Sequence, residues 1–138
     1  MTADVQHAGG CQCGAVRFGI AGPLRAALYC HCGRCRRSHG GVAAYTACKR
    51  ERLTLLDDRE LRWYDSPDPT DPARRGFCGR CGSRLFWDRP ERTTISIAAG
   101  AIDLPTGFLA AGHIYAADKG DYYEIADGLP CFDGNAPS

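Results

Sequence analysis

The chain has 138 residues, with 17 Lys or Arg against 16 Asp or Glu, so its formal net charge is +1. This balance excludes a strong general attraction to nucleic acid or to a membrane surface. A hydrophobic fraction of 44% allows a real core, and the length predicts a single domain over residues 1–138. The N-terminus lacks the apolar segment of a signal peptide, and no run of about 18 apolar residues occurs, so we expect a cytoplasmic protein.

Short runs rich in β-branched and aromatic residues alternate with turn signals along the chain, such as HAGG at 7–10. This pattern predicts a mostly β fold with strands over 14–20, 24–30, 42–48, 52–57, 61–65, 74–78, 84–88 and 93–99. Helical periodicity is rare, and the best short helix candidates are 33–40 and 117–125. The proline-rich SPDPTDP at 66–72 predicts a solvated loop within the domain.

Nine cysteines are the strongest signal in the composition, and seven of them form three groups. The groups are Cys11-x-Cys13, Cys30-x-Cys32-x-x-Cys35 and Cys78-x-x-Cys81. Thiolate-rich tetrahedral sites suit zinc, so zinc is the predicted metal. Two alternatives remain open. Disulfides conflict with the odd number of cysteines and the absence of an export signal, and an iron–sulfur cluster conflicts with the spacing.

The spacing also predicts how the thiols point. Glycines follow both Cys78 and Cys81, so the backbone can turn tightly and direct both sulfurs at one ion. In a C-x-C pair on an extended strand, both thiols face the same side and the residue between them faces away. His31, between Cys30 and Cys32, is therefore expected to point away from its neighbours.

Two divisions of the cysteines are compatible with the spacing. In the first, the Cys11 and Cys13 pair joins the Cys78 and Cys81 pair in a four-thiolate site, which leaves a group of three. In the second, the 32/35 pair joins the 78/81 pair, as two zinc knuckles would, and the other cysteines have no partners. The spacing favours the first division only modestly.

Four blocks come in the order and spacing of one known family: GGCQCGAVRF (9–18), CHCGRCRRSHG (30–40), FCGRCGSRLF (77–86) and HIYAADKGDYYEIADGLPCF (113–132). The chain resembles the glutathione-dependent formaldehyde-activating family, also called the centromere protein V/Gfa domain, over residues 9–132. The resemblance implies a mostly β, Mss4-like complex fold with short helices, stapled by zinc. It also implies a structural zinc at Cys11, Cys13, Cys78 and Cys81, and a second zinc with an open position at Cys30, Cys32 and Cys35.

An open site of this kind predicts carbon–sulfur chemistry. Three thiolates make a divalent ion a weak Lewis acid but a good binder of a further thiol, which loses its proton on binding. The resemblance implies a zinc-dependent carbon–sulfur lyase or synthase that acts on glutathione–aldehyde adducts such as S-(hydroxymethyl)glutathione. We expect two Zn²⁺ per chain, with the open second site incompletely occupied, and glutathione or an adduct of it as the partner.

Other residues are candidates for secondary roles. Arg36, Arg37 and His113 are the predicted substrate-binding residues. Arginines beside the thiolates can attract carboxylates, and His113 opens the last of the four family blocks. His39, four residues after Cys35, has a spacing that permits ligation from a helix. The remaining cysteines, Cys48 and Cys131, are expected to be ordinary core or near-surface residues.

The alternative function is a non-catalytic, zinc-stabilised binding or chaperone-like module, in which both metals only hold the fold. The sequence does not fix the substrate, the direction of the reaction or the oligomeric state.

Overall fold

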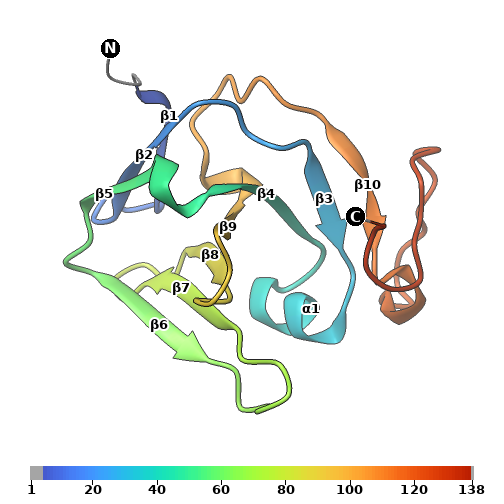
Figure 1. Cartoon of the computed structure of the whole chain (residues 1–138). Helices are drawn as coiled ribbons and strands as arrows, with labels where there is room; N and C mark the ends of the chain where they lie inside the picture. Colours follow the sequence, from blue (N-terminus) through green and yellow to red (C-terminus); the bar gives the residue numbers. More distant parts are fainter. Residues whose placement is uncertain (1–4, 138) are drawn as a thin grey trace.

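The structure, a computed structural model, describes residues 5–137 and is mostly β (Figure 1). The strands are β1 (Val5–Gly10), β2 (Arg17–Ala21), β3 (Ala27–Cys30), β4 (Ala43–Lys49), β5 (Leu53–Asp57), β6 (Leu61–Asp65), β7 (Arg74–Cys78), β8 (Arg84–Asp88), β9 (Thr94–Ala98) and β10 (Ala110–Ile114). The helices are α1 (Gly33–His39) and three 3₁₀ turns, η1 (Arg50–Arg52), η2 (Ala99–Ala101) and η3 (Ala116–Asp118). No helix within residues 5–137 has the length and apolarity that crossing a membrane requires.

The strands form two sheets. The smaller has the order β1-β2-β5 and is antiparallel. The larger has the order β10-β3-β4-β9-β8-β7-β6, and its pairs are antiparallel except for β10 with β3. Figure 1 shows α1 lying between β3 and β4 on one side and β6 and β7 on the other. Side chains of the helix and of distant strands can therefore face a common space.

The buried side chains form two clusters, and each cluster includes thiols. The first contains Phe18 and Phe86, whose ring centroids are 5.2 Å apart, together with Cys11 and Cys78. The second contains Cys30, Cys35 and Tyr45, among others. Both groups of cysteines thus sit where the core meets the surface, which fixes the backbone that carries them.

The structure confirms most of the predicted elements. Each predicted strand overlaps one of β2 to β9, the loop at 66–72 joins β6 to β7, and the helix at 33–40 corresponds to α1. Local chemistry explains the bounds of α1. Cys32 is the N-cap residue and its Sγ accepts a hydrogen bond from the Cys35 N–H at 3.3 Å. Gly40 ends the helix with φ of 75°, a left-handed conformation that suits glycine.

The turn predicted at 7–10 is wrong, because HAGG forms most of β1. Its glycines serve close packing instead of a turn. A Cβ at Gly9 would overlap the carbonyl oxygen of Ala101 and the ring of Phe18, so only glycine lets this strand lie against its neighbours.

The structure also corrects the C-terminal part of the chain. The helix predicted at 117–125 is wrong, since only the short turn η3 is helical there. β10 was not predicted, because its sequence AAGHI carries little β-branched character. Tertiary contacts define this strand. It pairs in parallel with β3, and the His113 N–H donates to the carbonyl of Pro130 at 2.8 Å.

A buried carboxylate ties the β7–β8 hairpin to η1. Asp88 is fully buried, and its oxygens accept hydrogen bonds from Arg50 Nη2 at 2.7 Å and Arg74 Nε at 3.0 Å. We expect Asp88→Ala to lower the free energy of unfolding by about 3 kcal/mol, because both guanidinium groups lose their buried partner. Urea denaturation measures the change. Glu91→Ala, which breaks the exposed pair with Arg89, should cost less than about 1 kcal/mol; equal losses would contradict the assignment.

Candidate metal centres

Four cysteines from distant parts of the sequence lie together. The sulfurs of Cys11, Cys13, Cys78 and Cys81 are all within 4.8 Å of one another. Cys11 Sγ is 3.6 Å from Cys13 Sγ, which is 3.9 Å from Cys78 Sγ. All nine cysteines are free thiols, so neither pair forms a disulfide. Of the two divisions compatible with the spacing, the structure has the first.

Backbone turns direct these sulfurs inward. Cys11 and Cys13 follow β1 in a turn, closed by the hydrogen bond from Gly14 N–H to the Cys11 carbonyl at 3.2 Å, so the expected extended backbone is wrong for this pair. Val16 N–H donates to Cys11 Sγ at 3.2 Å. In the second turn, the N–H groups of Arg80 and Cys81 each donate to Cys78 Sγ at 3.4 Å. Although burial opposes it, the hydrogen bond from Val16 N–H helps to lower the pKa of Cys11, and the thiolate is the form that binds metal.

Ser83 links the two turns and favours ionisation of the Cys81 thiol. Its Oγ accepts a hydrogen bond from Gln12 N–H at 2.9 Å and lies 3.2 Å from Cys81 Sγ. Hydrogen bonding from Ser83 lowers the pKa of Cys81 to about 5. Four converging sulfurs, held by N–H and O–H donors, fit a closed tetrahedral ion of the kind that stabilises a fold.

A second group has three thiols. Cys30 ends β3, Cys32 caps α1 and Cys35 lies in its first turn, and their sulfurs are within 4.8 Å of one another. The pKa of the Cys32 thiol is far below its usual range because the thiols of Cys30 and Cys35 hydrogen-bond to it, and the same interaction raises the pKa of Cys30. Within residues 5–137, no further His, Cys, Asp or Glu joins this group. Three soft donors on one side fit an ion with a free position.

The two histidines near the three thiols, His31 and His39, have other hydrogen-bond partners. His31 faces away, as expected: its Nδ1 is 2.6 Å from Tyr123 Oη and its Nε2 is 2.8 Å from His113 Nδ1. His39 Nε2 lies 2.6 Å from Tyr45 Oη, and burial lowers the pKa of His39 to about 4. Neither ring is directed at the three sulfurs.

The two remaining cysteines lie apart from both groups. Cys48 is buried in the first core cluster, and Cys131 is exposed near the C-terminus. Both positions agree with the expectation of ordinary core and near-surface residues.

The three-thiol group opens into a cavity of about 740 Å³. Two acidic residues, Asp71 and Asp118, and six arginines line the cavity together with the thiols; the arginines are Arg25, Arg34, Arg37, Arg75, Arg89 and Arg92. Arg75 is the one in contact with the sulfurs, since its Nη2 is 3.4 Å from Cys35 Sγ and its Nη1 is 3.4 Å from Tyr45 Oη. The four-thiol group lines neither this cavity nor the one beside it. The two groups therefore differ in their surroundings: only the three-thiol group lines a cavity, and that cavity has an excess of positively charged side chains.

Two comparisons with known proteins point to the same family. The family model described as "Glutathione-dependent formaldehyde-activating enzyme" matches residues 6–118. A Halomonas elongata protein named "Putative glutathione-dependent formaldehyde-activating enzyme" is 30% identical over 127 residues, which cover 85% of this chain and 79% of that protein. The chain belongs to the glutathione-dependent formaldehyde-activating (GFA) family.

The GFA match contains every cysteine of both groups and ends at Asp118. A crystal structure of a Rhodobacter sphaeroides protein has the same fold, with a TM-score of 0.58 and 24% identity; the match covers 77% of this chain and 98% of that one. The family resemblance is thus confirmed, and the match covers the first three sequence blocks and the start of the fourth.

The predicted substrate-binding residues of this GFA member occupy different surroundings. Arg37 lines the cavity beside the thiols. Arg36 is not among the lining residues, and its buried Nε has no hydrogen-bond partner within residues 5–137. His113 is buried on β10, where its ring stacks on Tyr29 of β3 and its Nε2 lies 2.8 Å from Asp127 Oδ2, and it does not line the cavity.

Sequence reasoning missed Arg75, although a signal for it was present. In the strand RRGFC, Arg75 and Phe77 alternate with the buried Gly76 and Cys78, so both must face the opposite side of the sheet from the core. What could not be predicted is that α1 covers this side, which places Arg75 against Cys35.

Proposed function

We propose that this GFA protein binds zinc at both thiol groups and forms or cleaves the carbon–sulfur bond of glutathione–aldehyde adducts such as S-(hydroxymethyl)glutathione. Cys11, Cys13, Cys78 and Cys81 hold the structural ion, and Cys30, Cys32 and Cys35 hold the other. One observation carries the proposal: the three-thiol group, and not the four-thiol group, lines an arginine-rich cavity. Family membership supports the substrate class. A single domain over 1–138 and a cytoplasmic location stay predictions.

The chemistry follows from the donor set. When bound there, zinc would supply a fourth coordination position at which an incoming thiol is held as the thiolate. Three cysteine thiolates leave the centre with a net negative charge, and the Arg75 guanidinium at 3.4 Å from Cys35 Sγ offsets part of it. In the synthetic direction the sulfur attacks the aldehyde carbon, and the thiol proton ends on the former carbonyl oxygen. In the lyase direction the hydroxyl oxygen of the adduct loses its proton and re-forms the carbonyl, the same carbon–sulfur bond breaks, and the sulfur leaves as thiolate.

The remaining arginines of the cavity would favour glutathione over a neutral thiol. Glutathione carries two carboxylates, and planar guanidinium groups bind carboxylates through paired hydrogen bonds. Arg25, Arg89 and Arg92 line the same cavity as the three sulfurs. Together with Arg37 they can hold both ends of the tripeptide while its sulfur is at the thiol centre, which orients the reacting atoms.

The test is metal-dependent turnover. Protein loaded with two zinc ions per chain should accelerate exchange between formaldehyde, glutathione and their adduct by on the order of 100-fold over buffer, followed by NMR exchange spectroscopy. Removal of the more labile ion by a chelator should abolish the acceleration, and zinc should restore it. Cys131→Ser, a thiol outside both groups, should behave as the unmodified chain does. Fully loaded protein without acceleration would rule out this reaction.

A further inference from the structure

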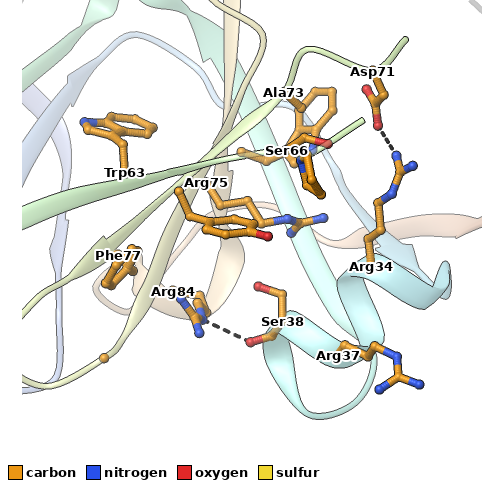
Figure 2. Close-up of a pocket in the computed structure, with 14 residues that line it drawn as sticks. Arg34, Arg37, Ser38, Trp63, Ser66, Asp71, Ala73, Arg75, Phe77 and Arg84 are labelled. Atoms are coloured by element: carbon orange, nitrogen blue, oxygen red, sulfur yellow. Dashed lines mark hydrogen bonds and ion pairs between the residues drawn. The ribbon is translucent and has the colours of Figure 1, made fainter. Parts of the chain in front are cut away.

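A second cavity of about 640 Å³ adjoins the arginine-rich one. It lies between the outer face of β6, β7 and β8, the helix α1 and the loop that follows β6 (Figure 2). The two cavities share five lining residues: Arg34, Arg37, Asp71, Arg75 and Trp87. The second cavity therefore borders the space in front of the three thiols.

Aromatic side chains from three neighbouring strands form one wall of this second cavity. The register places Tyr64 of β6 opposite Arg75 of β7, and Arg75 opposite Trp87 of β8, so the three side chains form a row on one face. Phe77 lies two residues beyond Arg75 and faces the same way. Tyr64 is 56% exposed, so an open aromatic surface is available to a ligand. A cavity lined in this way fits a flat apolar group.

Arg75 and Trp87 mark the boundary between the two spaces. The Arg75 guanidinium lies 3.4 Å from Cys35 Sγ, and Trp87 packs against the core cluster that contains Cys30 and Cys35. In Figure 2 the Arg75 side chain extends between Phe77 and Arg34, across the middle of the pocket. A substituent on a sulfur held at the thiol centre would pass these two residues and enter the aromatic cavity.

The size of this space sets a condition on the substrate. The formaldehyde adduct adds one carbon and one oxygen to the sulfur, which leaves the aromatic cavity unused, whereas cavities of about 300–1,000 Å³ hold whole small-molecule ligands. We propose that the aromatic cavity is a subsite for the carbonyl-derived part of the substrate. The preferred adducts are those of aromatic or extended apolar aldehydes, with the ring against Tyr64, Phe77 and Trp87. This inference rests on the proposed function, in that a thiol binds at the three-cysteine centre.

The reaction balances as for formaldehyde. The thiol sulfur bonds to the aldehyde carbon, the carbonyl π electrons move to oxygen, and that oxygen takes the proton lost from the thiol. The product is a hemithioacetal, and no oxidant or reductant is needed. The reverse step breaks the same carbon–sulfur bond.

Binding of unreactive probes tests the subsite. We expect the zinc-loaded protein to bind S-benzylglutathione at least about tenfold more tightly than S-methylglutathione in titration calorimetry, because the benzyl ring is removed from water. Benzyl mercaptan should show a similar advantage over ethanethiol, which repeats the comparison without the tripeptide. Tyr64→Ala and Phe77→Leu should each reduce the two affinity ratios severalfold. Tyr122→Ala removes a tyrosine that is 65% exposed and lines neither cavity, and it should leave both ratios unchanged.

Each result has a distinct meaning. Affinity ratios near one with both carriers overturn the subsite, as do ratios that survive in Tyr64→Ala and Phe77→Leu when circular dichroism shows both variants folded. An aromatic advantage with benzyl mercaptan, together with no binding of glutathione itself or of either derivative, upholds the subsite and refutes glutathione as the carrier. An advantage with both carriers that the Tyr64 and Phe77 variants reduce supports both proposals.

Discussion

Cys78→Ser should unfold the chain. Cys78 is fully buried in the core cluster that contains Phe86 and belongs to the four-thiol group. Its Sγ accepts hydrogen bonds from two backbone N–H groups. This group connects the turn after β1 with the turn between β7 and β8, and these turns belong to different sheets. A structural zinc contributes on the order of 10–16 kcal/mol of apparent binding energy, comparable to the whole stability of a domain, which is about 5–15 kcal/mol. Serine provides a harder and less acidic donor, so most of that contribution is lost.

Circular dichroism, urea denaturation and zinc content per chain measure the outcome. Cys48→Ser is the matched control, because Cys48 is buried in the same core cluster but lies outside both thiol groups. Burying a hydroxyl there should cost about 1–3 kcal/mol and leave a cooperative transition with both metals bound. If Cys78→Ser shows the same modest loss as Cys48→Ser, the four thiols do not hold a structural ion.

Much of the fold was predictable because its strands are short, rich in β-branched and aromatic residues, and separated by turn residues. RLFWD, for example, became β8, with Leu85 and Phe86 in the core and Trp87 on the other face. β1 and β10 were missed for a common reason. Their glycines and alanines are selected by close packing against other segments, such as the Pro130 carbonyl near Gly112, and this requirement leaves no local pattern.

The candidate site was predictable to a similar extent. The spacing of the cysteines was enough to identify the two groups as candidates, and the distances between sulfurs decide between the two divisions. The electrostatic surroundings were not predictable, because they depend on which strands meet around α1. Arg36 and Arg37 are adjacent in the sequence, yet only Arg37 lines the cavity, whereas Arg75 comes from a strand 40 residues beyond Cys35.

Cys32→Ser should have the opposite consequence to Cys78→Ser, with the fold kept and the activity lost. Cys32 is half-buried, and its main structural contact is the hydrogen bond that its Sγ accepts from Cys35 N–H as the N-cap of α1. Serine is among the best N-cap residues, so this role is preserved. The three-thiol group, however, is reduced to two sulfurs. We expect zinc content to fall by about one ion per chain and kcat/KM for the glutathione adduct to fall at least about 100-fold.

Urea denaturation and turnover have to be measured on the same preparation, since the comparison distinguishes an enzyme from a zinc-stabilised binding module. If Cys32→Ser has a urea midpoint close to that of the unmodified chain but has lost turnover, the ion at the three-thiol group takes part in the reaction. Unfolding of Cys32→Ser would instead make the three-thiol group structural, and the arginine-rich cavity in front of it would then need another explanation. Ser38→Ala, a change on α1 away from the sulfurs, controls for damage to the helix alone, because the Arg84 Nε hydrogen bond goes to the Ser38 backbone carbonyl and not to its side chain.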